Sequence, residues 1–360
     1  MTSTRFTRRD ARVPAAAQTG LRRIEVIDVP MPAPGPGEVL VELTAVGICG
    51  SDLHYFRMGR IGSHGLQFPQ ILGHEPAGIV AGVGRGVRGF KEGQAVAVEP
   101  GISCGRCRPC RQGRANLCYA VRFLGSPGVT GAFQRFLTMP VSSVVRLPRQ
   151  IDPALASAAE PLGVAIHAMH LVRLRRGESV AVIGGGPIGL SVVALARSRG
   201  AKVVVLSDPR SARRAAAEQL GAAGTVAPEM LVAAAREVTG GLGVAAVFEC
   251  SGAPEALDLA VAACERGGRV AMLGIAEVDC VTVDPHEWRN RELEVVQVRR
   301  SNHVLPRVLA HLTKNDLGLH RAGFFTSTVG LAGVQRAFEE LDRPASRDIK
   351  IVVDPRKVSP

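Results

Sequence analysis

The chain has 360 residues, of which 46% are apolar, so it is long enough to form two hydrophobic cores with a cleft between them. No apolar run reaches the roughly 18 to 20 residues that a membrane span requires, so we expect no membrane association. The net charge of +12 comes from 44 Lys and Arg against 32 Asp and Glu, spread along the chain. Dispersed charge without a nucleic-acid motif argues against nucleic-acid binding.

The eight cysteines bear on the compartment and on metal binding. Four of them fall within residues 104–118, which is too tight for a secreted disulfide framework in a large, glycine-rich chain and is typical of metal ligation. We therefore expect a reducing, cytoplasmic environment. Residues 1–14 contain four arginines but no apolar segment behind them, so they are predicted to be a disordered tail rather than a secretory signal.

Residues 15–155 predict an irregular, β-rich domain. Short β segments within 23–46 are interrupted at 32–37 by Pro-Ala-Pro-Gly-Pro-Gly, a turn that cannot continue a strand. Further β patterning follows at 77–83, 94–99 and 133–139.

The pattern changes at Asp152 and Pro153, which are expected to cap and open an alanine-rich helical stretch reaching residue 170. From residue 178 onward, apolar strands alternate with helices. The expected strands are 180–183, 202–206, 244–248, 269–273 and 293–298, and the expected helices are 187–199 and 211–220. Apolar strands separated by helices indicate a parallel sheet covered on both faces. Residues 156–298 are therefore predicted to be a doubly wound, Rossmann-type domain in an α/β protein. Beyond it we expect a helix at 331–341 and a last strand at 349–353.

A glycine motif follows the first of these strands. Gly184, Gly186 and Gly189 satisfy the G-x-G-x-x-G pattern, with Pro187 and Ile188 between the last two. The motif stands directly after an apolar strand and opens a helix, which is the context of a dinucleotide site. The first glycine can make the tight turn, the second can admit a pyrophosphate, and the third allows close helix packing.

The same fingerprint expects an acidic residue about 20 positions further on, and Asp208 stands there at the end of the next strand. A carboxylate at this point binds ribose hydroxyls and repels a 2′-phosphate, which favours NAD over NADP. Arg210, Arg213 and Arg214 are close in sequence and could accept that phosphate, so NADP stays the alternative.

Four soft ligands stand in one loop, which we call the four-cysteine loop: Cys104, Cys107, Cys110 and Cys118. Four cysteines can close a tetrahedral structural zinc site. The alternatives are reduced cysteines without a metal and a redox dithiol, which would need only two of the four.

A second candidate set is dispersed along the chain: Cys49, His74, Glu75 and Glu160. Each of them alone could be a structural residue. A catalytic zinc needs about three protein ligands and one open position, and a cysteine, a histidine and a carboxylate would provide that. The set suggests a catalytic zinc site.

These segments together resemble the zinc-containing medium-chain dehydrogenases, and within them the sorbitol and xylitol dehydrogenase branch. The likeness runs from about residue 23 to residue 353 and rests on the four-cysteine loop, the glycine fingerprint, and the motifs at 47–55, 59–62, 73–75 and 160–162. It implies a GroES-like β domain that carries the catalytic zinc and a Rossmann domain, with the active site in the cleft between them. It also implies that residues 299–360 return to the first domain and that the protein is a homodimer or homotetramer.

The resemblance assigns the metal-site roles residue by residue. Cys49 and His74 match zinc ligands, and Glu160 matches a further ligand, direct or through water. Glu75 matches a carboxylate that lies at the metal or just behind it. Asp52 matches a group that orients His74, as ligand histidines generally require.

The remaining roles concern the proton, the substrate and the cofactor. Ser51 and His54 match a relay that carries the alcohol proton to solvent. The positions that hold substrate hydroxyls in the polyol branch are matched by Tyr55, Glu160, Arg299 and Arg300. The positions that contact NAD are matched by Ile188, Asp208, Arg213 and Gly274.

Two departures from the family pattern bear on the substrate. Many polyol dehydrogenases have an aromatic residue where this chain has Arg300, and a Thr-His-Arg segment where it has Phe-Thr-Ser-Thr at 325–328. Both lie in the C-terminal part, which shapes the pocket or an interface.

We therefore expect a zinc-dependent oxidoreductase that transfers a hydride from a secondary alcohol of a polyol or sugar-derived substrate to NAD, giving a ketone. The polar residues Tyr55 and Glu160 favour a multiply hydroxylated substrate. An amino alcohol such as L-threonine is the second candidate and simple alcohols are the third. The alternative from another class is a catalytically silent NAD-binding protein on the same fold, against which the intact ligand set argues.

Overall fold

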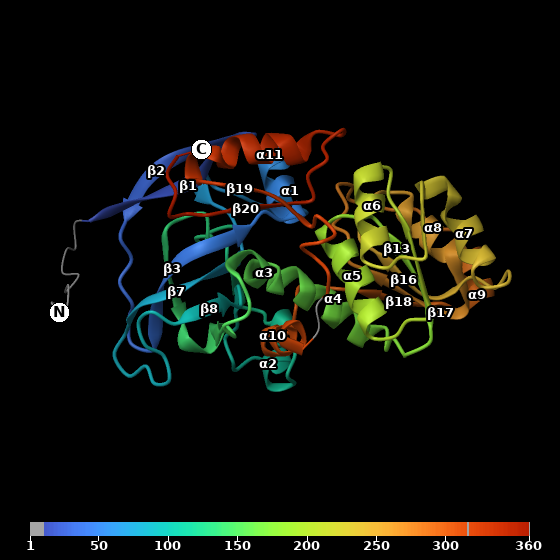
Figure 1. The fold of residues 1–360 in the computed structure, drawn as a ribbon, viewed down its shortest axis with the longest axis horizontal. Coiled ribbons are helices and arrows are strands. Elements are labelled where there is room, and N and C mark those ends of the chain that lie inside the picture. Colours follow the sequence, from blue (N-terminus) through green and yellow to red (C-terminus); the bar gives the residue numbers. More distant parts are fainter. Residues whose placement is uncertain (1–10, 315–316, 360) are drawn as a thin grey trace.

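Two bodies lie side by side in the protein, one β-rich and one built on a parallel sheet (Figure 1). The structure is a computed structural model and describes residues 11–314 and 317–359. The predicted α/β class, with a β-rich domain and a doubly wound domain, is confirmed.

The first domain is organised around a seven-stranded sheet in which distant parts of the chain meet. Its strand order is β12-β8-β7-β3-β20-β19, with β11 also paired to β3. These strands are β3 (Glu38–Gly47), β7 (Glu75–Val83), β8 (Ala95–Val98), β11 (Phe136–Pro140), β12 (Val144–Arg146), β19 (Phe325–Val329) and β20 (Lys350–Val353). Because β20 pairs with β3, the end of the chain is built into the first domain.

A smaller sheet, in the order β2-β1-β6, corrects the expected tail. Its strands are β1 (Arg12–Gly20), β2 (Arg23–Pro30) and β6 (Gln70–Ile71). The ladder between β1 and β2 begins at Arg12, paired with Pro30, so the predicted disordered tail is wrong for residues 12–14. Backbone pairing to β2 orders these residues although their composition resembles a tail. Residues 1–10 lie outside the described part of the chain.

Aromatic packing holds two helices against the first domain. The helix α1 (Gly50–Met58) carries Phe56, whose ring centroid lies 5.2 Å from that of Phe338 on α11 (Val334–Asp342). Phe133 contacts Phe338 edge-on at 5.9 Å. All three rings are buried, so α1, which bears the expected proton-relay residues, has a fixed position on the sheet.

The second domain contains a six-stranded, wholly parallel sheet in the order β15-β14-β13-β16-β17-β18. The strands are β13 (Ser179–Ile183), β14 (Val203–Ser207), β15 (Gly224–Val226), β16 (Val244–Glu249), β17 (Cys264–Met272) and β18 (Glu294–Gln297). The helices between them are α5 (Pro187–Ser198), α6 (Ser211–Gln219), α7 (Leu231–Glu237), α8 (Ala256–Ala263) and α9 (Pro285–Arg291). The predicted strands are confirmed. β17 begins at Cys264, five residues before the expected start, and the prediction missed this part because it includes the non-apolar pair Gly267-Gly268.

The segments that join the two domains differ from the prediction. The expected helix over 152–170 is two helices, α3 (Pro153–Ser157) and α4 (Ala159–Leu171), and Asp152 caps the first by accepting a hydrogen bond from the Leu155 N–H. Residues 299–360 do not all return to the first domain. The helix α10 (Leu305–Lys314) packs on α4 and shares its core with the parallel sheet, because its apolar face matches that of α4. The return begins with β19.

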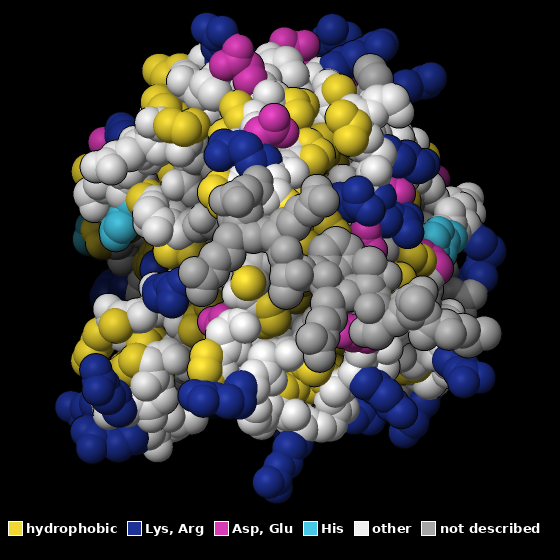
Figure 2. All heavy atoms as spheres, turned by 90° about the vertical axis from the view of Figure 1, so that its left-hand side faces the viewer, with side chains coloured by type: hydrophobic (Ala, Val, Ile, Leu, Met, Phe, Trp, Pro, Cys, Tyr) yellow, Lys and Arg dark blue, Asp and Glu magenta, His cyan; other side chains and the backbone are white. Residues whose placement is uncertain are grey.

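One face of the first domain carries its charge in dispersed form. Figure 2 shows the face of the first domain that lies at the left of Figure 1, where Lys and Arg side chains stand singly or in small groups among acidic and apolar ones. The expected lack of nucleic-acid binding stays a prediction. None of the described helices combines the length and apolar composition needed to cross a bilayer.

Candidate active site and metal centres

A cleft of about 600 Å³ is lined by residues of both domains. The first domain contributes Cys49, Ser51 and His54, and the second contributes the glycine turn and Asp208. Residues of the first and second domains that were predicted to take part in one reaction therefore line one cavity, although they are more than a hundred residues apart in sequence. Tyr55, His74, Glu160, Arg299 and Arg300 are not among its lining residues.

The glycine turn has the geometry that its sequence predicts. Gly184 directly follows β13 and has a positive φ of 95°, and Gly186 is the N-cap of α5. A Cβ on Gly189 would lie 1.8 Å from the Gly184 carbonyl oxygen, so only glycine lets the helix start this close to the strand. Gly274 is equally confined, since a Cβ there would meet the Gly252 nitrogen at 2.2 Å. The backbone of this wall is open to a flat or anionic ligand.

Asp208 lies at the end of β14 beside this turn. Its Oδ2 accepts a hydrogen bond from the Gly185 N–H at 2.7 Å, and its Oδ1 accepts one from the Arg210 N–H at 2.8 Å. Nη1 of Arg213 is 3.6 Å from Oδ2. Buried nitrogens of two arginines, Nη1 of Arg210 and Nε of Arg213, have no hydrogen-bond partner among the described residues. A carboxylate and two guanidinium groups therefore stand together beside the glycine turn.

Three candidate ligands converge at the boundary of the first domain. Ligand atoms of Cys49, His74 and Glu75 all lie within 4.8 Å of one another. Cys49 is the N-cap of α1, and His74 and Glu75 stand at the start of β7, after Gly73 with its positive φ of 91°. A thiol, an imidazole and a carboxylate at this spacing form a donor set that fits zinc.

The buried carboxylate of Asp52 holds this group in place. It accepts hydrogen bonds from the Cys49 N–H at 3.0 Å and from the Gly73 N–H at 3.2 Å, and it lies 3.4 Å from Nδ1 of His74. Burial disfavours a charged imidazole, but Asp52 and Cys49 outweigh it and raise the pKa of His74 well above its ordinary value. The surroundings of His74 thus favour a positive charge, which a bound cation would also supply.

Glu75 has a partner that the sequence analysis did not identify. The Nζ of Lys350, on β20, donates to both Glu75 carboxylate oxygens at 2.8 and 2.7 Å and to the Ile48 carbonyl at 2.9 Å. Lysine and carboxylate are both almost wholly buried. The sequence did contain a sign of this pair, namely a lysine in an otherwise apolar strand. Buried lysines are nearly always paired with an acidic group.

Glu160 lies near this cluster but outside the group of three. It stands in the first turn of α4, and burial raises its pKa to about 8, with smaller effects from His74, Glu75, Glu99 and Lys350. The structure therefore places a carboxyl group beside the candidate ligands without bringing it within their mutual distance.

The expected relay residues lie on α1. Ser51 Oγ is 3.5 Å from Nε2 of His74. Nδ1 of His54 is buried, has no hydrogen-bond partner among the described residues, and lies 3.7 Å from Glu277 Oε1. Burial lowers the pKa of His54, although Glu277 opposes this. The imidazole is therefore poised to be neutral, as a proton acceptor must be.

The four-cysteine loop brings its thiols together as predicted from the spacing. All four ligand atoms lie within 4.8 Å of one another, and all four cysteines are free thiols. The Cys104 N–H donates to Cys118 Sγ at 3.2 Å. Backbone N–H groups of Arg106 and Cys107 lower the pKa of Cys104 to about 6, whereas desolvation raises that of Cys110 to about 11. Four sulfurs at this spacing fit a tetrahedral metal and leave no pair joined as a disulfide.

The expected substrate residues Tyr55, Arg299 and Arg300 do not line the cleft. Tyr55 is buried, and burial together with Asp52 raises its pKa. Arg299 is exposed. The Arg300 guanidinium stacks over the Phe123 ring at 4.1 Å, and that ring lies 5.2 Å from His74.

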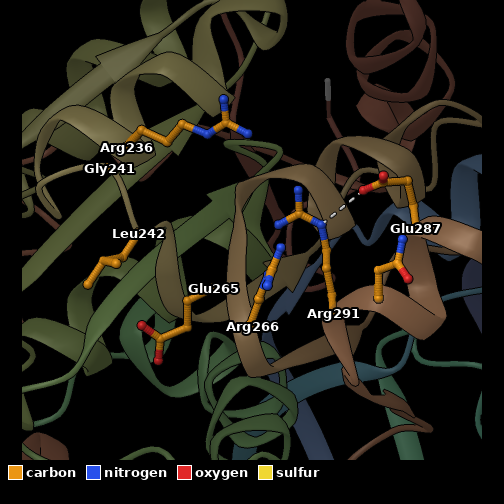
Figure 3. Close-up of a pocket in the computed structure, with 8 residues that line it drawn as sticks. Arg236, Gly241, Leu242, Glu265, Arg266, Glu287 and Arg291 are labelled. Atoms are coloured by element: carbon orange, nitrogen blue, oxygen red, sulfur yellow. Dashed lines mark hydrogen bonds and ion pairs between the residues drawn. The ribbon is translucent and has the colours of Figure 1, made fainter.

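A second cavity, of about 560 Å³, opens at α7 and α9 on the second domain (Figure 3). Its lining includes Arg236, Arg266 and Arg291, the last paired with Glu287 at 3.3 Å. None of the predicted site residues lines it. The convergence of motif residues, rather than cavity size, identifies the functional cleft.

Comparison with known proteins shows the family of this chain. Residues 35–149 match the alcohol dehydrogenase GroES-like domain, and residues 187–314 match the zinc-binding dehydrogenase domain. The chain is 34% identical to sorbitol dehydrogenase of Bacillus subtilis, over 95% of this chain and 97% of that protein. It is 39% identical to L-threonine 3-dehydrogenase of Pyrococcus abyssi, over 70% and 72% of the two chains.

Solved structures give the same result. A zinc-binding dehydrogenase from Sinorhizobium meliloti, solved with NADP bound, is 31% identical and superposes with a TM-score of 0.87, over 96% of this chain and 100% of that one. The chain belongs to the zinc-dependent medium-chain dehydrogenase family. It is an oxidoreductase, similar in sequence to the polyol dehydrogenase branch of that family.

Proposed function

We propose that the protein oxidises a secondary alcohol of a polyol or sugar-derived substrate to a ketone, with NAD as the hydride acceptor. The observation that carries this proposal is the cluster of Cys49, His74 and Glu75, because Cys49 and Glu75 line the same cleft as the dinucleotide turn. The similarity to sorbitol dehydrogenase supports a polyol substrate.

Two zinc ions are proposed, one in each candidate centre. Cys49 and His74, with Glu160 directly or through water, would hold the catalytic ion, and the four-cysteine loop would hold the structural one. Glu75 would lie behind the catalytic ion, since Lys350 already takes both of its oxygens. When bound, zinc acts as a Lewis acid toward the substrate hydroxyl and the nicotinamide accepts the hydride.

The residues of this chain would move the proton and hold the substrate. Ser51 and His54 both face the cleft, and His54 is kept neutral by burial. We expect Ser51 to accept the substrate hydroxyl proton and His54 to pass it to solvent. Tyr55 and Arg299 would hold further hydroxyl groups.

The proposed cofactor is NAD, bound through the Asp208 carboxylate. A specific observation favours NADP as a second candidate, namely the unpartnered nitrogens of Arg210 and Arg213 beside that carboxylate. Guanidinium groups of this kind pair readily with a 2′-phosphate. Comparing kcat/KM for NAD and NADP separates the two, and if NADP is the cofactor, Arg213→Ala should lower the NADP value much more than the NAD value.

A substrate panel tests the reaction itself. NADH formation is followed with polyols, sugar acids and L-threonine, with and without a zinc chelator. Turnover of a polyol that the chelator abolishes supports the proposal, whereas turnover of L-threonine alone favours the amino-alcohol alternative, which the similarity to L-threonine 3-dehydrogenase suggests. No turnover despite bound zinc and NAD indicates the silent binding protein.

A matched pair of cysteine variants tests the metal assignment. Cys49→Ala should abolish turnover while NAD binding, measured by calorimetry, persists. Cys280→Ala changes an exposed cysteine outside the cleft and should keep full activity. Retained turnover in Cys49→Ala would contradict the assignment.

Sedimentation velocity tests the expected homodimer or homotetramer.

A further inference from the structure

The segment 299–303, which follows β18, adopts an unusual backbone. Arg300 and His303 have positive φ angles of 59° and 50°. Residues other than glycine rarely adopt positive φ angles. Where they do, the surrounding structure holds the backbone in place, and such residues often lie at functional sites. We therefore asked which contacts hold the Arg300 backbone in this conformation and what its side chain could bind.

The restraint comes from the first domain. Nδ2 of Asn116, in the four-cysteine loop, donates to the Arg299 carbonyl at 2.9 Å, and Nδ2 of Asn302 donates to the Gly113 carbonyl in the same loop at 2.8 Å. The Ser301 hydroxyl donates to the buried Glu99 carboxylate at 3.0 Å. Three side-chain hydrogen bonds thus fix the backbone on both sides of Arg300, so the position of its side chain is set before any ligand binds.

The Arg300 side chain is then held next to the candidate metal ligands. Its guanidinium lies over the Phe123 ring at 4.1 Å from the centroid, and the Phe123 ring lies 5.2 Å from that of His74, tilted by 46°. Burial and Arg299 lower the pKa of Arg300 to about 10, with Tyr55 and Glu160 opposing, so the side chain remains a cation at neutral pH.

One nitrogen of this partly buried cation lacks a partner among the described residues. Nη1 of Arg300 is buried and has no hydrogen-bond partner within the described residues, and no ion pair joins Arg300 to a carboxylate there. A buried, charged donor without a partner is costly, whereas a guanidinium paired with a two-oxygen anion is among the strongest polar contacts in proteins. Arg299 adds a second positive charge next to it.

We propose that Arg300 binds an anionic group of the substrate, so that this enzyme prefers a polyol bearing a carboxylate or a phosphate over a neutral polyol. This inference rests on the proposed alcohol oxidation at the same site. In this proposal the anion pairs with the Arg300 nitrogen that has no partner among the described residues. Neutral polyols leave the buried nitrogen unpaired and lose that contact.

The test compares three substrates of equal carbon number: a hexitol, a hexonate and a hexitol phosphate. For each we measure kcat/KM with the wild-type enzyme, with Arg300→Gln, which removes the charge, and with Arg300→Lys, which keeps it. Arg88→Gln, at an exposed arginine of the first domain, is the matched control for the loss of one charge. Calorimetric titration of the same compounds into zinc-loaded enzyme gives affinities that do not depend on turnover.

The wild type should favour one of the two anions over the hexitol by about tenfold or more, and the better anion identifies carboxylate or phosphate. Arg300→Gln should reduce the ratio of anionic to neutral kcat/KM about 10- to 100-fold, mainly through KM, and Arg300→Lys should restore part of it. Arg88→Gln should keep the wild-type ratio.

Two different results would count against the inference or against the proposed function, and the assays tell them apart. If the hexitol is oxidised as well as the anions and Arg300→Gln leaves the ratio unchanged, the inference is overturned while alcohol oxidation stands. If no compound turns over, the proposed function fails, and the titrations still decide whether Arg300 binds an anion.

Discussion

Replacing Lys350 by Met should strongly destabilise the protein. Lys350 Nζ makes three hydrogen bonds, two to the Glu75 carboxylate and one to the Ile48 carbonyl, and the pair is almost wholly buried. Methionine keeps the length of the side chain but leaves a buried carboxylate without its counter-charge. Breaking a buried ion pair in this way typically costs about 3–5 kcal/mol, which is a large share of the stability of a domain.

The measurement is urea unfolding of the zinc-loaded enzyme, with zinc content determined for every variant. Glu75→Gln combined with Lys350→Met should be less destabilised than the sum of the two single changes, with a coupling energy of about 2 kcal/mol. Lys350→Arg keeps the charge and is the matched control. If Lys350→Met lies within about 1 kcal/mol of the wild type, the pair contributes little net stability and the reasoning is wrong.

The pH dependence of this effect has a definite sign. Burial would lower the pKa of Lys350, but the Glu75 carboxylate outweighs it and the pKa is raised. The stabilisation from this shift is therefore fully present below the unfolded-state pKa, about 10.4, and is lost only as the pH rises through the higher folded-state value. The Lys350 contribution itself should be constant from pH 7 to 9. The difference in stability between the wild type and Lys350→Met should nevertheless grow as the pH rises through about 8, because Lys350 lowers the pKa of Glu160, which is about 8, and its loss moves that pKa further up.

Three further predictions concern packing, metal and protons. Gly47→Ala should cost about 1–3 kcal/mol in urea unfolding, because its Cβ would lie 1.9 Å from a Glu75 carboxylate oxygen, whereas Gly50→Ala, with open space, should be near neutral. Removing zinc from the four-cysteine loop with a chelator should lower Tm and expose four titratable thiols, and an unchanged Tm would mean that no metal stabilises the loop. Glu277→Gln should move the acidic limb of kcat/KM to lower pH, because Glu277 raises the pKa of His54 against the larger effect of burial; a shift to higher pH would contradict the relay role.

The elements that could be predicted from sequence are those whose signal is local. The parallel sheet follows from strands that are apolar throughout, such as β13 and β16, since both of their faces are covered. The glycine turn lies within residues 184–189 and the four-cysteine loop within residues 104–118, so the spacing within one short segment already indicates their geometry. Their positions matched the prediction for that reason.

What could not be predicted depends on contacts between distant residues. The strand pairing that orders residues 12–14 needs β2, and the packing of α10 on α4 needs the apolar faces of both helices. The partner of Glu75 lies 275 residues away in sequence. A composition or periodicity pattern contains no information on which of several strands such a residue will face.

The same distinction explains why substrate class is harder to predict than reaction class. Apart from Glu160 on α4, the residues proposed for the reaction stand in short motifs at 47–55 and 73–75, which the pairing of β3 with β7 brings together. The environment of Arg300 instead requires Phe123 from β10 (Arg122–Phe123), the four-cysteine loop and a left-handed backbone to coincide. Because this environment is assembled from three separate segments, a change in any one of them can alter substrate preference while the zinc and dinucleotide motifs stay intact.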